Sequence, residues 1–201
     1  MRDLSHPIEP EMPTFPGDPI VETWPHATID RTGFNLTAIG MGTHTGTHID
    51  APSHVEPDGK PLSAYPLDRF RYRARIVDCD VGGEDPITRD TLPDDASADL
   101  LLFHTGWDRH WGDERYWEHP YLDVECARAC AQRGLDVGID CPSVDAPRDG
   151  LRAHHELFRD DRLVVENLTN LGELSERATV FAFPLPFVAT DGSPVRVVAE
   201  E

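Results

Sequence analysis

The chain has 201 residues and a mass of 22.5 kDa; 39% of its residues are hydrophobic and 27% are charged. This size and composition are ordinary for a soluble globular domain, which can bury a core without disulfides or a structural metal. The 37 acidic residues against 18 basic ones give a formal net charge of −19. That charge argues against nucleic acid and anionic membrane surfaces as partners, because both are bound mainly through Lys and Arg.

The first predicted element is an extended, irregular segment from Pro7 to Pro25, because proline fixes its own backbone and disfavours helix in the residue before it. Short alternating or apolar runs farther along are typical of strands. These predicted strands cover residues 35–41, 72–79, 100–104, 135–139, 163–165, 179–183 and 195–198. Helices are predicted over 123–133, which begins at an Asp and stops at Gly134, and over 149–160. The pattern predicts one α+β domain over residues 1–201 with a strand-rich core.

The four cysteines form no C-x-x-C pair. We interpret them as buried free thiols in a reducing cytosol, rather than as a disulfide or a metal site. The N-terminal residues hold no apolar stretch, which predicts that there is no secretory signal. The longest apolar run, 180–188, is interrupted by two prolines and is far shorter than a membrane span. We therefore expect a cytoplasmic protein.

One segment carries most of the candidate chemistry: His44-Thr45-Gly46-Thr47-His48-Ile49-Asp50-Ala51-Pro52-Ser53-His54. Three imidazoles and one carboxylate fall within eleven residues. Neutral histidine and ionised aspartate are the usual ligands of catalytic zinc and similar divalent ions. The alternative is that these are ordinary polar turn residues. That reading suits one isolated histidine better than four metal-competent groups beside a glycine and a proline.

The spacing tests whether these side chains can share one ion. In a strand, His48 and Asp50 point to the same face. In an extended chain His44 and His48 would lie about 13 Å apart, whereas two ligands of one ion at ~2.1 Å are at most about 4 Å apart. The chain must bend between them, and Gly46 permits the bend because it lacks a Cβ and accepts positive φ. The poor helix formers around Gly46 favour a tight turn over a helix.

A set of three ligands leaves positions open for water, and a divalent ion lowers the pKa of such water toward neutrality. Hydrolysis is therefore the natural reaction class. His54, after the turn at Pro52, is expected to face the same ion without binding it directly.

A second cluster of candidate ligands lies downstream. His154 and His155 fall in the predicted helix 149–160, where the alternative is an exposed surface pair. Glu166 follows a strongly apolar run, so it needs a partner if it is buried; the alternative is a strand-end carboxylate that faces solvent. The remaining histidines receive ordinary interpretations. We expect His6, His26, His110 and His119 at the surface and a structural role for His104. Asp140 and Asp145 are expected to shape turns.

The segment His44–His54 resembles the H-x-G-T-H-x-D-x-P-x-H signature of the cyclase-like metal-dependent hydrolases, a family that includes bacterial kynurenine formamidase (arylformamidase) and isatin hydrolase. The resemblance extends along the chain through weaker motifs in the family's order. They are Asp3–Ile8, Phe15–Asp18, Thr105–Trp107, Gly138–Asp145, Val165–Leu168 and Ser193–Arg196. It implies a swivelling β/β/α fold and a dimer or higher homo-oligomer.

The resemblance also implies roles by position. His44, His48 and Asp50 match the ligands of a first metal, and Asp50 would bridge to a second. His154 and Glu166, twelve residues apart as in the formamidases, match the ligands of that second metal. The implied cofactor is zinc, or alternatively manganese, with two ions per chain. His54 matches the family's proton donor and acceptor.

One position departs from the formamidase pattern: Phe15 stands where a Trp typically packs on the substrate ring. Phe15 is therefore the candidate substrate-binding residue, and an aromatic contact survives without the indole N–H. The expected activity is hydrolysis of an amide-type C–N bond in a small molecule, with N-formyl-kynurenine or a related aryl-formamide as substrate. The enzyme alternative is an isatin-like opening of a cyclic amide. The alternative from another class is a non-catalytic metal- or ligand-binding protein, which would not need His54.

Overall fold

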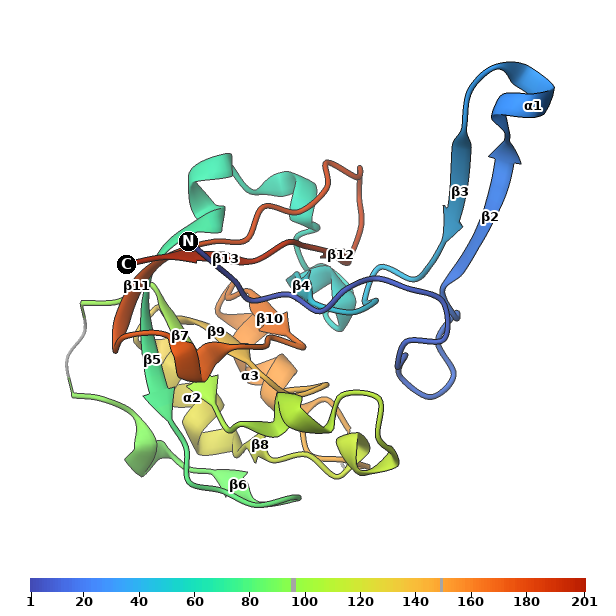
Figure 1. The fold of residues 1–201 in the computed structure, drawn as a ribbon. Coiled ribbons are helices and arrows are strands. Elements are labelled where there is room, and N and C mark those ends of the chain that lie inside the picture. Colours follow the sequence, from blue (N-terminus) through green and yellow to red (C-terminus); the bar gives the residue numbers. More distant parts are fainter. Residues whose placement is uncertain (95–96, 149) are drawn as a thin grey trace.

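The computed structural model describes residues 1–94, 97–148 and 150–201, and the largest feature of this described part is a nine-stranded mixed sheet. The strand order across the sheet is β1-β13-β11-β5-β7-β9-β10-β4-β12 (Figure 1). In chain order the strands are β1 (Arg2–Asp3), β4 (His48–Asp50), β5 (Arg71–Asp78), β7 (Leu100–His104), β9 (Asp136–Ile139), β10 (Val164–Glu166), β11 (Arg177–Phe181), β12 (Gly192–Pro194) and β13 (Val198–Glu200). The central β5, β7, β9 and β10 are parallel, and the flanking strands pair antiparallel.

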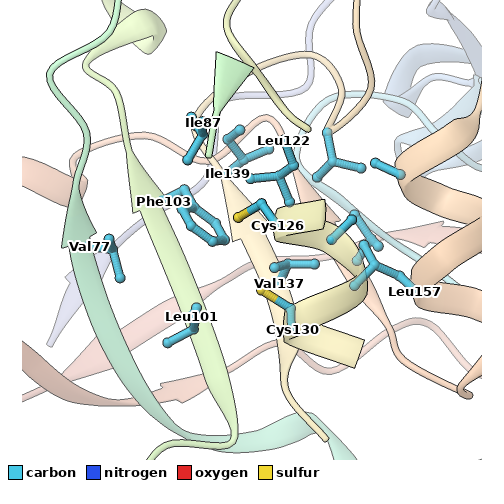
Figure 2. Close-up of a cluster of buried hydrophobic side chains, with 14 of the residues drawn as sticks. Val77, Ile87, Leu101, Phe103, Leu122, Cys126, Cys130, Val137, Ile139 and Leu157 are labelled. Atoms are coloured by element: carbon cyan, nitrogen blue, oxygen red, sulfur yellow. The ribbon is translucent and has the colours of Figure 1, made fainter. Parts of the chain in front are cut away.

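The central strands are apolar because both of their faces are covered. In β7, Leu101 and Phe103 belong to one core cluster, which also includes residues of helices α2 (Val124–Gln132) and α3 (Arg152–Arg159) (Figure 2). Leu100 and Leu102 belong to a second cluster with residues of β4, β5 and β13. Successive side chains of a strand point to opposite faces, so a strand that is buried on both sides has an uninterrupted apolar sequence.

Helix α2 begins where the sequence predicts. The Asp123 side chain accepts a hydrogen bond from the Cys126 backbone N–H at 2.6 Å, which caps the helix start. The helix ends just before Gly134, whose φ of +74° is the left-handed conformation that glycine adopts without strain. Cys126 and Cys130 lie on the buried face of this helix (Figure 2). All four cysteines are free and buried, as predicted.

A hairpin projects from the sheet (Figure 1). It consists of β2 (Glu22–Ala27), the short helix α1 (Ile29–Thr32) and β3 (Leu36–Gly40), and we call residues 22–40 the arm. Most of its residues are exposed, apolar ones included. A separate two-stranded sheet pairs β6 (Pro86–Ile87) with β8 (Tyr121–Leu122).

The α+β prediction is confirmed, with two differences among the elements. Strand 195–198 is mostly wrong, because the ladder begins at Val198 and runs to Glu200. Helix 149–160 begins only at Arg152, and residue 149 lies outside the described residues. The sequence analysis missed β1, β2, β4, β6, β8, β12 and α1, which are all short or exposed. Among the described residues no helix is both long enough and apolar enough to cross a membrane.

Candidate metal centre

The predicted bend between His44 and His48 is present. Gly46 has a φ of +62°, which turns the chain just before β4 begins at His48. β4 then lies between β10 and β12, where Glu166 is the register partner of His48 and Gly192 is the partner of Asp50. Strand pairing therefore brings residues more than 100 positions apart in sequence to one place.

The first group of ligand atoms joins the turn to β4. Nδ1 of His44 lies 2.6 Å from Oδ1 of Asp50, and Nε2 of His48 lies 3.3 Å from the same oxygen. These three atoms lie within 4.8 Å of one another. Two ligands of a tetrahedral ion at ~2.1 Å are about 3.4 Å apart, so this group has close to the spacing that one ion requires.

The second group shares Asp50 with the first. Nε2 of His154, from α3, lies 3.5 Å from Oδ2 of Asp50 and 3.4 Å from Oε1 of Glu166. The other Glu166 oxygen lies 3.5 Å from Nε2 of His48. The two carboxylates thus each face both groups. The side chains of His154 and Glu166 are almost completely buried, so neither is an exposed helix residue or a strand end that faces solvent.

In His44, His48 and His154, the ring nitrogen on the side away from Asp50 already makes a hydrogen bond. His48 donates its Nδ1–H to the carbonyl of Gly46 at 2.8 Å, and His154 donates its Nδ1–H to Asp145 at 2.5 Å. His44 donates its Nε2–H to Asp191 at 2.9 Å. A carboxylate or carbonyl can only accept, so each of these three ring nitrogens carries a proton. The second ring nitrogens, His44 Nδ1, His48 Nε2 and His154 Nε2, face the Asp50 carboxylate and are available to a cation when they carry no proton.

These converging atoms fit a divalent cation. Among the described residues, neither oxygen of Asp50 nor Nε2 of His154 has a hydrogen-bond partner, although all three atoms are buried. Burial raises the pKa of Asp50, but the imidazoles of His48 and His44 outweigh burial and hold it well below its usual range. Burial lowers the pKa of His48, but Asp50 and Glu166 raise it well above its usual value. The cluster therefore attracts positive charge, and a cation bound there would displace protons.

The His44 ring lies close to Gly192, where a side chain would clash with it. A Cβ on Gly192 would lie 2.7 Å from Cε1 of His44 and 3.1 Å from Oδ1 of Asp50. We expect Gly192→Ala to push the ring away from Asp50 and to weaken metal binding by about 10- to 100-fold, the size of effect that misplaced ligands produce. Metal titration of the chelated protein measures this. Gly40→Ala is the matched control because its added Cβ meets only ordinary contacts, from 3.6 Å outward; equal affinity in the two variants would contradict the prediction.

A cavity of about 410 Å³ opens over the cluster. His44, His48, His154 and Glu166 line one part of it, and His54 lines it as well. His54 ends a 3₁₀ turn that begins at Pro52, and its ring centroid lies 4.1 Å from that of His44. Burial lowers the pKa of His54, which keeps the imidazole neutral and able to accept a proton at pH 7.

Three further residues, which the sequence does not single out for this role, make hydrogen bonds that position the candidate ligands. Asp145, predicted only to shape a turn, accepts from His154 and also from the Ala153 backbone N–H at the start of α3. Asp191 accepts from His44 and lies 3.5 Å from Nδ1 of His54. Asn167 donates to the Gly46 carbonyl at 2.9 Å, beside the His48 hydrogen bond. No local pattern marks Asp191, because its partner is 147 residues away.

For the other histidines, some of the predictions agree with the structure and others are wrong. His26 is exposed, as expected, but His119 is buried and only 3% exposed. His104 bonds Asp78 at 2.8 Å and is not a lining residue of the cavity, which agrees with a structural role. The surface prediction for His6 is wrong, because its imidazole stacks on Trp111 with a centroid distance of 3.8 Å and an interplanar angle of 6°.

The burial of His6 has a consequence for stability. Burial lowers its pKa from 6.5 to about 4, so between these values the unfolded chain binds more protons than the folded one. We expect the free energy of unfolding to fall as the pH drops from 6.5 toward 4, with a His6 share of at most about 3 kcal/mol. Urea unfolding of wild type and His6→Phe across this range measures that share. Parallel pH profiles for the two proteins would contradict the prediction.

A sequence model of the family described as "Putative cyclase" matches residues 2–146 of this chain. The chain belongs to this cyclase family. The kynurenine formamidase of Salinibacter ruber is 35% identical to this cyclase-family chain over 209 aligned positions, covering 99% of this chain and 96% of that protein. The kynurenine formamidase of Bacillus cytotoxicus is 33% identical and covers 98% and 95%.

Solved structures agree with the sequence relatives. Isatin hydrolase A from Labrenzia aggregata superposes with a TM-score of 0.86 at 25% identity, covering 98% of this cyclase-family chain and 92% of that one. A structure described as a potential metal-dependent hydrolase with cyclase activity gives a TM-score of 0.83 at 27% identity, covering 98% and 96%. The predicted family, the α+β fold and the class of hydrolase acting on C–N bonds other than peptide bonds are confirmed. A divalent-metal cofactor is supported by the ligand groups together with the second of these structures.

Proposed function

We propose that this protein is a divalent-metal-dependent aryl-formamide hydrolase that converts N-formyl-kynurenine, or a close relative, into the free aryl amine and formate. Support comes from the formamidase relatives and from the buried ligand groups beneath a cavity of suitable size. Cavities for small ligands commonly measure about 300 to 1,000 Å³. The negative charge of −19 leads us to expect neither nucleic acid nor an anionic membrane as a partner. We further propose a cytoplasmic location.

Five residues would hold two ions, for which we propose zinc. The first would take His44 Nδ1, His48 Nε2 and one oxygen of Asp50, and the second would take the other Asp50 oxygen, His154 Nε2 and Glu166. A divalent cation supplies Lewis acidity, which lowers the pKa of water and polarises a carbonyl oxygen. Oxygen and imidazole donors also suit manganese, so elemental analysis decides between the two metals.

His54 is the proposed general base and acid. Its neutral imidazole accepts a proton as water attacks the formyl carbon, and it returns that proton to the departing nitrogen. Asp191, 3.5 Å from Nδ1, is placed to orient this ring and also accepts from His44. Asp145 and the Gly46 carbonyl keep His154 and His48 in the tautomers that leave Nε2 free.

The cavity offers an aromatic surface to the leaving group. Phe15 lines it and lies edge-on to Trp117, with ring centroids 5.9 Å apart. Aromatic pairs in this geometry contribute about 0.5–1.5 kcal/mol beyond their buried area. We propose that Phe15 contacts the substrate ring, as a Trp does at the matching position of the formamidase pattern.

The observation that carries the proposal is the Asp50 carboxylate, whose two buried oxygens lie close to imidazole nitrogens but have no hydrogen-bond partner among the described residues. The test is to measure N-formyl-kynurenine cleavage by the purified protein, then after chelation, and again after the metal is returned. We expect loss and recovery of turnover. A turnover that is unaffected by chelation removes the proposed mechanism.

Isatin is the second substrate to test, because isatin hydrolase A shares the fold over 98% of this chain. Its ring opening breaks an amide-type C–N bond with the same demand for activated water and a proton carrier. The alternative of a non-catalytic metal-binding protein predicts that neither substrate is turned over although the metal is bound.

We also propose a homodimer, formed through the arm. Trp24, Leu36 and Ile39 on its strands are 47%, 48% and 57% exposed, and an isolated two-stranded hairpin is only marginally stable in water. Apolar exposure of this kind is typical of a surface that a partner covers. A second copy of the chain is the occupant that the family resemblance implies.

The arm gives a direct prediction on oligomeric state. We expect the double substitution Trp24→Ser, Leu36→Ser to shift the protein from dimer to monomer at micromolar concentration, because it removes two large exposed side chains from one face of the hairpin, where Trp24 is paired with Ala38. Sedimentation equilibrium measures the mass. Thr37→Ser, on the same strand, is the control and should remain dimeric; a double variant that also stays dimeric would place the interface elsewhere.

A further inference from the structure

The lining of the cavity also contains an aromatic side chain that is held more firmly than Phe15. Trp111 lines the cavity, and the imidazole of His6 lies parallel to its indole at 3.8 Å. This is the closest ring stack among the described residues. His6 comes from the N-terminal segment and Trp111 from the loop between β7 and β8, so the two segments meet at this wall.

Both sides of this pair are anchored. The His6 backbone N–H donates to Oγ1 of Thr47 at 2.9 Å, and the Thr47 hydroxyl donates to the Asn167 carbonyl at 2.6 Å. On the other side Trp111 packs edge-on against Tyr116 at 5.3 Å, and the Tyr116 hydroxyl donates to the Asn167 side chain at 2.7 Å. The contacts of His6 and those of Trp111 therefore both lead to Asn167, which is next to Glu166 in the chain.

The side chain of Trp111 is held in place more firmly than that of Phe15. Phe15 is 55% exposed, and its one ring contact among the described residues is with the edge of Trp117. Trp111 is half-buried, and His6 and Tyr116 restrain it from two directions. An aromatic side chain that is already held in place gives up less conformational freedom when a ligand ring packs on it, so it contributes more to affinity and selectivity.

We propose that Trp111 selects an aryl group in this cavity and that His6 is the positioning residue that holds its indole; the inference rests on the aryl-formamide activity proposed above. The imidazole of His6 packs as a flat neutral ring, and its Nε2 has no hydrogen-bond partner in the described part of the chain. A stacking role accounts for a half-buried imidazole whose buried Nε2 makes no hydrogen bond there.

The test measures binding separately from turnover. The probe is 2-aminoacetophenone, an ortho-amino aryl ketone that has the chemistry of the leaving amine. Calorimetric titration of zinc-loaded protein should show its Kd rising about tenfold in Trp111→Leu and by about threefold in His6→Ala. Trp111→Phe and His6→Phe keep flat rings and should stay within about twofold to threefold of wild type. His104→Gln, a partly exposed histidine outside the cavity, is the control and should bind as wild type does.

Turnover gives an independent measurement. The ratio of kcat/KM for formanilide to that for N-cyclohexylformamide, which differ only in aromaticity of the ring, should fall about tenfold in Trp111→Leu, mostly through KM. Unchanged zinc content and melting temperature show that the variant is folded and loaded.

The outcomes separate the two proposals. A wild type that binds 2-aminoacetophenone through Trp111 but cleaves no formamide would contradict the proposed function and leave this inference standing. An unchanged Kd in Trp111→Leu, or no measurable binding by wild type, would overturn the inference. A His6→Phe variant as weak as His6→Ala would overturn the positioning role of His6.

Discussion

Replacing His54 by alanine is expected to lower kcat by about 10²-fold or more while leaving the metal content unchanged. The imidazole lines the cavity beside His44, and its nearest carboxylate is Asp191 at 3.5 Å. Its burial keeps it neutral, so it can take a proton from water and then protonate the departing nitrogen. Steady-state kinetics on N-formyl-kynurenine and elemental analysis of the same preparation measure the two quantities.

Measuring kcat and metal content on the same sample distinguishes loss of a proton carrier from loss of metal. His54 is not among the five residues that we assign to the ions, so a loss of metal in His54→Ala would mean that the assignment is wrong. An unchanged rate with full metal content would mean that another group carries the proton, or that the protein binds a ligand without catalysis.

Asp50→Asn is expected to produce the larger loss, of at least about 10³-fold in kcat, together with loss of metal. Asp50 belongs to both groups of ligand atoms, through Oδ1 toward His44 and His48 and through Oδ2 toward His154. The amide removes the negative charge and turns one oxygen into an N–H donor that faces an imidazole. Metal content and kcat should therefore fall together.

Asp191→Asn is the matched control for this substitution. Asp191 contacts His44 through the outer nitrogen and belongs to neither of the two Asp50 groups. We expect this variant to keep both ions at saturating metal and to lose about 10- to 100-fold in affinity. An Asp50→Asn protein that retains two ions and full activity would show that the carboxylate is not a ligand.

The sequence points to the candidate ligands around Asp50 because several of them are concentrated in one short segment. The requirement that His44 and His48 share an ion predicted a bend at Gly46, and Gly46 has positive φ. The apolar run before Glu166 leaves open a buried carboxylate with a partner or one that faces solvent; Glu166 is buried, and the Val144 backbone N–H donates to it at 2.8 Å. In both cases the physical constraint acts over a few residues, which is the range that a sequence pattern covers.

The groups that hold the ligands escaped prediction because they depend on pairing between distant strands. Asp191 reaches His44 only because β12 pairs with β4, and both strands have three residues, too few for an alternating pattern. His6 was expected at the surface because its stacking partner, Trp111, is more than 100 residues away. The strand predicted at 195–198 was displaced because apolar Val195 and Val197 are buried outside the ladder.

The most direct test of the central claim is the metal content per chain of an active preparation, measured by elemental analysis with kcat recorded on the same sample. We expect two divalent ions per chain, loss of turnover as chelation removes them, and recovery when zinc or manganese is returned. A preparation that keeps full turnover with no divalent ion would contradict the claim that the imidazoles and carboxylates around Asp50 bind a catalytic cation.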